Sequence, residues 1–153
     1  MTSRIFKIEG LQQLTDAFRA LDRDVQANVA RAVTNAGAQV FKTRIAALAP
    51  VASEPYKIED VIVQPGNIGR NVVVKRLKPS DTSATSEHLV VVRGKRKYGY
   101  ASRVGALQEF GTVKQPAQPY FRPGADQAAE PALDAMKQKF KARMEKAIRD
   151  ASK

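Results

Sequence analysis

The sequence of 153 residues has no cysteine, no tryptophan and a single histidine, His88. Without cysteine, disulfides, thiolate metal ligands and thiol nucleophiles are all excluded. The strongly apolar runs are short, as in residues 61–63 and 89–92, whereas a helix that crosses a bilayer needs about 20 apolar residues. The first residues lack the apolar core of a secretory signal, so we expect a protein that is made and used in a cytoplasm, with no membrane partner.

Residues that carry out catalysis are also scarce. His88 falls in a predicted strand with no acidic or serine partner at a recognisable spacing, so a structural histidine is the better interpretation. The acidic residues are scattered, and residues 66–70 have neither the glycine spacing nor the lysine of a phosphate-binding loop. We therefore expect no enzyme, and no catalytic, cofactor or metal site.

Positive charge is abundant and unevenly distributed. The net charge is +11, and residues 70–97 contribute eight basic and two acidic side chains. Such a block attracts polyanions, so a nucleic acid or an acidic protein surface is an admissible partner, while solubility alone is the simpler explanation. Aromatic residues are not interleaved among these lysines and arginines, which argues against sequence-specific reading of a nucleic acid.

The N-terminal third predicts helices. From Leu11 to Leu48 apolar residues recur every three or four positions, and Pro50 ends the pattern. A continuous helix over residues 11–49 would be roughly 60 Å long, longer than a domain of this size, so we expect a bend near residues 21–23 with Asp22 as the cap of the second helix.

The middle of the chain predicts strands. Residues 60–64, 71–77 and 87–93 are short and rich in β-branched side chains. The turn at residues 64–67 favours antiparallel pairing of the first two, and the polar loop at residues 78–86 is expected to project.

The chain ends in an amphipathic pattern over residues 125–151. Its predicted apolar stripe is Ala129, Leu133, Met136, Phe140, Met144 and Ile148, and a core helix with a solvated basic face is favoured over a helix that reads DNA. The predicted fold is therefore a single α+β domain over residues 1–153. It comprises a long, bent N-terminal helical region (11–49), an antiparallel sheet of three or four strands (58–112), a proline-rich arm (113–124), and a C-terminal helix (125–151) packed on the sheet.

One segment is unlike an ordinary linker: Glu109-Phe110-Gly111-Thr112, followed by Pro-Ala-Gln-Pro at residues 116–119, two aromatic residues, and Arg122-Pro123. With this motif and this order of elements, the chain resembles a family of small tailed-phage proteins described as head–tail joining, neck or tail components. The chain departs from that family after Pro50, where residues 51–69 replace a shorter turn.

The resemblance implies a structural virion protein at the neck or tail top, present in the host cytoplasm during assembly. It implies a homo-oligomeric ring of six copies or a multiple of six, in contact with phage connector and tail proteins, with genomic DNA passing through its channel without sequence reading. The alternative is a stand-alone basic nucleic-acid-binding protein.

Two sets of residues are candidates for this role. In the motif, Gly111 is expected to take a conformation that is costly for other residues, and Phe110 to anchor a sharp turn in the core. The arm supplies the candidate subunit or partner interface: Pro116, Pro119, Tyr120, Phe121, Arg122 and Pro123. For Tyr120 a subunit contact and burial within the subunit both remain open, whereas Phe121 is expected to be buried within the subunit.

The second set contains the basic side chains that would meet DNA phosphates or an acidic neighbouring ring. These residues are Arg70, Lys75, Arg76, Lys78, Arg93, Lys95, Arg96 and Lys97.

Overall fold

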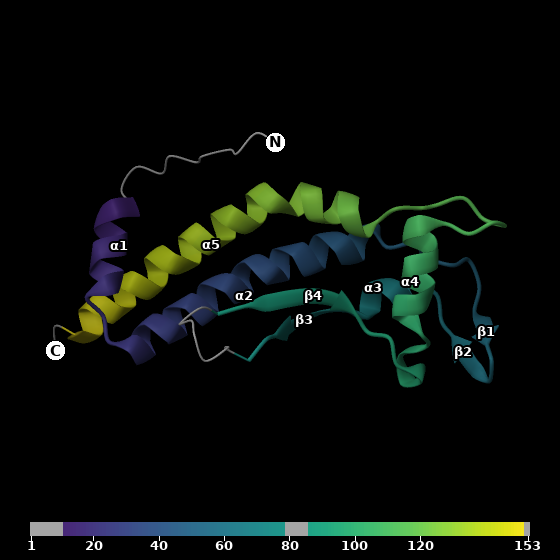
Figure 1. Ribbon diagram of the computed structural model, residues 1–153, viewed down its shortest axis with the longest axis horizontal. Helices are drawn as coiled ribbons and strands as arrows, with labels where there is room; N and C mark the ends of the chain where they lie inside the picture. Colours follow the sequence, from purple (N-terminus) through teal and green to yellow (C-terminus); the bar gives the residue numbers. More distant parts are fainter. Residues whose placement is uncertain (1–10, 79–85, 152–153) are drawn as a thin grey trace.

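The computed structural model describes residues 11–78 and 86–151, and shows an elongated α+β protein (Figure 1). Two long helices, α2 (Arg23–Leu48) and α5 (Phe121–Ala151), lie side by side, and the antiparallel pair β3 (Val72–Arg76) and β4 (His88–Val92) covers the other side of α2. The predicted fold class is confirmed. Most of the predicted projecting loop, residues 79–85, lies outside the described residues.

The predicted bend in the N-terminal region is confirmed. Helix α1 (Leu11–Arg19) ends just before it, and α2 begins at Arg23. Asp22 occupies the capping position, but its side chain makes no capping hydrogen bond. The side-chain amide of Gln26 instead donates to the carbonyl oxygen of Leu21, at 2.7 Å. The far end of α2 stops at Leu48, two residues before Pro50, as the sequence indicates.

The strands differ from the prediction in their pairing. There are four in the described residues, but they form two separate two-stranded sheets, β1 (Tyr56–Ile58) with β2 (Val61–Val63), and β3 with β4. The expected pairing of residues 60–64 with 71–77 is wrong. After β2 the chain enters the short helix α3 (Asn67–Arg70), because Gly66 at φ +75° starts a helical turn in place of a hairpin turn.

The segment before the motif is helical, whereas the sequence predicts that it belongs to the sheet region (58–112). A 3₁₀ turn, η1 (Arg96–Tyr98), leads into helix α4 (Ala101–Phe110). The buried residues of α4 are Ala101, Gly105 and Glu109, spaced by four, which is the period of a helix face. The small side chains on this face allow α4 to lie close to α3 and β4.

Helix α5 begins at Phe121, four residues earlier than predicted, so the proline-rich arm is shorter than expected. Its first turns reach the sheet, since Phe121 and Ala125 pack against the same buried cluster as Val90 and Val92. Its apolar stripe also differs from the prediction: the buried residues are Ala128, Ala132 and Met144, while Ala129 is exposed and Ile148 is 54% exposed. The contact with α2 thus includes Ala128 and Ala132, each one residue before the predicted Ala129 and Leu133, while the predicted Met136 lies against Gly37 of α2.

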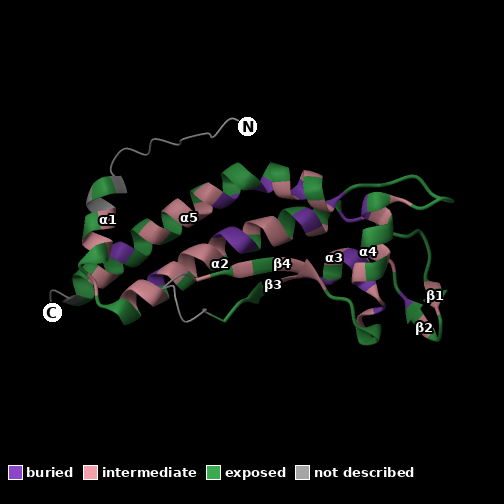
Figure 2. Cartoon of the chain, viewed as in Figure 1, coloured by how far each residue is buried: buried purple, intermediate pink, exposed green. Residues whose placement is uncertain are grey.

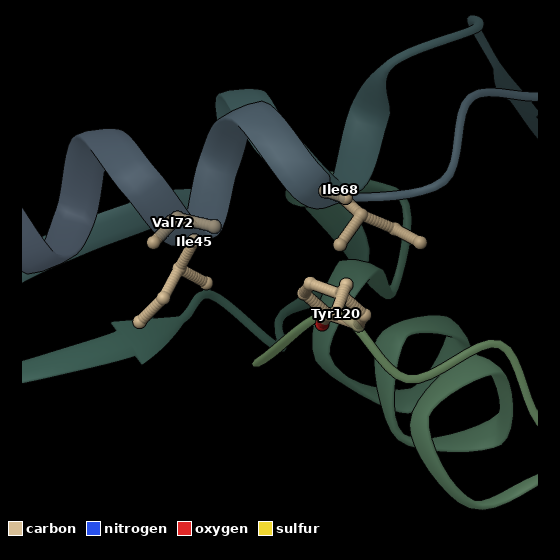
Figure 3. Close-up of a cluster of buried hydrophobic side chains, with 5 residues drawn as sticks. Ile45, Ile68, Val72 and Tyr120 are labelled. Carbon is tan, nitrogen blue, oxygen red and sulfur yellow. The ribbon is translucent and has the colours of Figure 1, made fainter. Parts of the chain in front are cut away.

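The core lies where the C-terminal end of α2 meets α3, β3 and the start of α5 (Figures 2 and 3). The buried cluster contains Ile45, Ala49, Ile68, Val72 and Tyr120. Gly124 lets α5 approach α2, because a Cβ atom on it would lie 2.9 Å from the Cα of Ile45. This packing holds α4 and the arm at one end of the molecule.

Candidate functional site

The burial of the motif residues differs from the sequence prediction. Phe110 was expected in the core, yet it is 72% exposed, and Glu109 is the buried residue at 5%. The physical reason is the helix: Glu109 continues the buried face of α4 set by Ala101 and Gly105, whereas Phe110 is turned about 100° away from it. The expectation that Phe110 anchors the core is therefore wrong.

The Glu109 carboxylate caps the start of α5 from a different helix. Its Oε2 accepts hydrogen bonds from the backbone N–H groups of Tyr120 and Phe121, at 2.7 and 2.8 Å. Its Oε1 accepts from the backbone N–H and the Nε of Arg122, at 3.2 and 3.0 Å. The first N–H groups of a helix have no partner within that helix, so this one side chain satisfies those of Phe121 and Arg122, together with the N–H of Tyr120 just before the helix.

The pKa of Glu109 reflects these contacts. Burial acts to raise it, but the N–H groups of Phe121 and Tyr120, together with the side chain and N–H of Arg122, outweigh burial and lower the pKa to about 2. The carboxylate is therefore charged at every physiological pH. It fixes the end of α4 to the start of α5 as a structural element.

The turn between them confirms the prediction for Gly111. Its φ is +75° with ψ near 180°, a region open essentially to glycine alone, and an added Cβ would lie 2.7 Å from the backbone nitrogen of Ala117. The Thr112 hydroxyl oxygen then accepts from the backbone N–H of Lys114 and of Gln115. The motif thus closes a compact turn at the base of the arm.

The arm itself, residues 112–119, is exposed along its whole length, including Pro116 and Pro119. Both of its ends are fixed, by the Thr112 turn and by the Gln118 N–H, which donates to the carbonyl oxygen of Gln108 at 2.7 Å. Pro116 restricts the backbone between these points, and Pro119 restricts it directly after them. The arm is therefore a preorganised surface feature.

Tyr120, the first residue after the arm, is buried within the subunit, with an exposed fraction of 2%. Its hydroxyl lies against Gly105 of α4. Phe121 is half-buried and meets the Tyr120 ring edge-on at 6.2 Å, as expected for a residue within the subunit. Arg122 and Pro123 belong to the first turn of α5.

The structure also reveals an apolar surface that the sequence interpretation missed. Leu107 and Phe110 lie one turn apart on α4 and are 48% and 72% exposed, and we call this pair the apolar strip. Val113, in the arm beyond the Gly111 turn, is fully exposed as well. The guanidinium of Arg122 lies 5.4 Å from the centre of the Phe110 ring. Leu107 and Phe110 are three residues apart, so they share one face of a helix. Had the sequence analysis assigned α4 as a helix, this spacing would have indicated the apolar surface.

The candidate phosphate contacts are all exposed, but they form two groups. Lys75, Arg76 and Lys78 lie at one end of the β3–β4 pair, and Arg93 follows the other end, about 14 Å away along the strands. Arg93 and Lys97 both lie over the Tyr98 ring, at 4.8 and 5.1 Å. The remaining residues of the second group are Arg70, Lys95 and Arg96.

Two of these basic side chains already have local partners. Arg70 donates to the carbonyl oxygen of Pro65 at 2.7 Å, and Arg96 forms an ion pair with Asp60. The sequence block of residues 70–97 therefore does not fold into one continuous basic surface. The loop with Arg93, Lys95 and Lys97 presents three exposed basic side chains close together in the sequence.

His88 has the structural role expected of it. Its Nδ1 lies 2.9 Å from the hydroxyl of Thr34 on α2, which joins the start of β4 to that helix. Burial, followed by the charges of Arg76 and Arg31, lowers the pKa of His88, so the neutral ring is favoured. This contact stabilises the sheet on α2.

Within residues 11–78 and 86–151, no cluster of histidine and acidic side chains has the makings of a metal site. None of the helices in these ranges combines the length and apolar character that crossing a bilayer requires. Comparison with protein-family models, curated proteins and solved structures found no match.

Proposed function

We propose that this chain is a structural virion protein of a tailed phage, a ring-forming neck or head–tail joining subunit that connects the head connector to the tail. The observation that carries the proposal is the apolar strip beside the fixed, exposed arm. Large apolar side chains that stand in solvent on a rigid support are typical of surfaces that another protein covers. The resemblance of the motif to that of phage neck proteins is the reason for proposing that the covering protein is another protein of the phage neck or tail.

The geometry of the motif fits a subunit whose contacts must be repeated many times. A stiff arm loses little conformational entropy when it binds. Glu109 fixes where the arm begins and ends, so each copy presents the same surface. Contacts between two different surfaces of identical subunits form a ring when the rotation from one subunit to the next brings the last copy back to the first. The resemblance implies a stoichiometry of six copies or a multiple of six.

Light scattering coupled to size exclusion, over a range of protein and salt concentrations, tests this proposal. We expect a mass of six or more copies, or a monomer that becomes a ring when connector and tail proteins are added. A monomer that ignores these proteins and binds DNA tightly would support the alternative, a stand-alone nucleic-acid-binding protein, which the exposed charge at Arg93, Lys95 and Lys97 favours.

In the proposed ring, the loop with Arg93, Lys95 and Lys97 faces the DNA channel and meets phosphates without reading bases. Replacing all three with glutamine is expected to lower the slope of log binding constant against log salt by about 3, since each phosphate contact contributes about 1. Binding to duplexes of unrelated sequence should weaken equally. Fluorescence anisotropy with labelled duplexes over a salt series measures both.

The matched control replaces Lys75, Arg76 and Lys78 with glutamine, which removes the same charge from the other end of the strands. This variant should keep the original slope. An equal decrease of the salt slope in both variants would show that net charge alone attracts DNA. It would contradict the proposal that the loop with Arg93, Lys95 and Lys97 contacts DNA in the channel.

A further inference from the structure

Strand β4 forms an outer edge of its two-stranded sheet. In the antiparallel pair β3–β4, the N–H of Arg93 donates to the carbonyl oxygen of Asn71 at 3.0 Å. Backbone groups alternate in direction along an antiparallel strand, so Val91, like Arg93, points its N–H toward β3. The N–H and C=O groups of Val90 and Val92 therefore point away from β3, and in the described part of the chain no hydrogen bond occupies them. We call these groups the free edge of β4.

A groove follows this free edge. Two open pockets, of about 370 and 410 Å³, share Val90 as a lining residue, and we call them together the β4 groove. The described residues that line it come from β4, α2, α4, α5 and the residues just before β4 and α5, and none comes from β3. The groove therefore lies on the free-edge side of the sheet. Its apolar lining includes Phe41 of α2, Met136 of α5 and the exposed Phe110 of α4.

The chemistry of the groove specifies an extended polypeptide as its occupant. Proteins commonly protect an edge strand with lysine, proline or a bulge. Strand β3 carries Lys75 and Arg76, whereas β4 reads His-Leu-Val-Val-Val and pairs with β3 without a bulge. Backbone donors and acceptors that recur at alternate residues, beside apolar walls, match the backbone and side chains of an added strand.

The segment before α1 is the part of the chain outside the described ranges that has the composition of a strand. The other residues outside those ranges are a polar loop and the last two residues of the chain. Residues 4–8 read Arg-Ile-Phe-Lys-Ile and equal the five residues of β4 in length. In an extended segment Phe6 and Ile8 project to one side and Lys7 to the other, so the two apolar side chains would face the groove together.

The position of α1 argues that this segment comes from a second copy of the chain. The Phe18 ring of α1 meets the Phe140 ring of α5 at 5.7 Å, and α1 begins on the side of α5 remote from α2 and the β3–β4 pair (Figure 1). Packed helices lie about 8–10 Å apart, so α5 and α2 separate Leu11 from β4 by roughly 20 Å. The three steps from Ile8 to Leu11 span only about 10 Å at full extension. Ile8 therefore cannot reach the β4 groove of its own chain.

We infer that residues 4–8 of one subunit add to the free edge of β4 in the next subunit as a third strand. The inference rests on the proposed function and names the contact that joins neighbouring copies. The segment and the groove are different surfaces, so the contact is heterologous and can close into a ring. Backbone hydrogen bonds to Val90 and Val92 hold the strand, and Phe6 and Ile8 fill the groove.

Hydrogen exchange of individual backbone amides in the assembled protein tests the added strand. The amides of Val90 and Val92 should exchange about tenfold more slowly, or slower still, in the full chain than in a variant that lacks residues 2–9. The amide of Val91, which points toward β3, is the internal control and should change little. Equal exchange of Val90 and Val92 in the two proteins would overturn the inference.

Because the chain has no cysteine, directed crosslinking identifies the source of the strand. The variants Lys7→Cys and Leu89→Cys place one thiol on the segment and one on β4, where Leu89 is 45% exposed. When the two variants are assembled together, a short bismaleimide should join them into covalent dimers that neither forms alone. An intramolecular link in a chain with both substitutions, without dimers from the mixture, would place the strand on its own chain and overturn the inference.

The matched control is Ile62→Cys, because Ile62 is 68% exposed on β2, in the other two-stranded sheet. Assembled with Lys7→Cys, it should give no dimers. Slow exchange of Val90 that requires connector or tail proteins, without the crosslink, would assign the groove to one of those proteins and overturn the inference.

These outcomes separate the contact from the ring. A ring that forms equally well without residues 2–9 overturns the contact alone. A full chain that stays monomeric even with connector and tail proteins overturns the ring as well.

Discussion

Replacing Glu109 with glutamine is expected to lower the free energy of unfolding by about 3 kcal/mol at pH 7. The pKa of this carboxyl falls from 4.5 to about 2 on folding, and each pKa unit is worth about 1.4 kcal/mol. Its side chain is only 6% exposed, so solvent screens these interactions little. Glutamine keeps one acceptor oxygen but loses the charge that three N–H groups and Arg122 share.

The same pKa shift predicts the pH dependence. The folded-state pKa lies below the unfolded value, so the stabilisation is fully present above about pH 4.5 and is lost as the pH falls toward 2. Urea unfolding at pH 7 and pH 3 should therefore show the difference between wild type and Glu109→Gln shrinking by about 2 kcal/mol. The exposed Glu54→Gln is the control and should change little at either pH. A constant difference at both pH values would show that Glu109 acts through its shape and not its charge.

Truncation of Ile45 to alanine is expected to cost about 3 kcal/mol. This side chain is 1% exposed and lies in the cluster where α2, α3, β3 and the start of α5 meet (Figure 3). The α5 backbone packs closely on one side of it, because a Cβ atom added to Gly124 would lie 2.9 Å from the Cα of Ile45, so a cavity on this side has little room to collapse. Thermal or urea unfolding measures the loss.

Leu48→Ala is the matched control, because Leu48 lies one turn further along the same helix and is 38% exposed. We expect it to cost less than about 1 kcal/mol. Equal losses at the two positions would contradict the placement of the core at the C-terminal end of α2.

The long helices α2 and α5 were predictable because their signals are local, whereas α3 and α4 were not predicted. Apolar spacing, Pro50 and the acidic cap position define the bounds of α2 in the sequence itself. The strand pairing was not predictable, because the turn at Gly66 is compatible with either a hairpin or a helix start, and only the packing of Ile68 in the core decides between them.

The motif illustrates the same limit at the candidate site. Its glycine conformation follows from residue type, so Gly111 was predicted correctly. The role of Glu109 depends on N–H groups 11 to 13 residues further along the chain, which α4 brings within reach only once it has formed. The same missing helix concealed Leu107 and Phe110 as neighbours on one face. Recognition of α4 would have revealed both the buried carboxylate and the apolar strip.

The central claim is that copies of this chain form a closed ring, and electron microscopy of the purified assembly in negative stain tests it most directly. End-on views should show a closed ring of six copies, or a multiple of six, around a channel wide enough for duplex DNA. Open filaments, two-fold dimers or isolated monomers in the presence of connector and tail proteins would contradict the account.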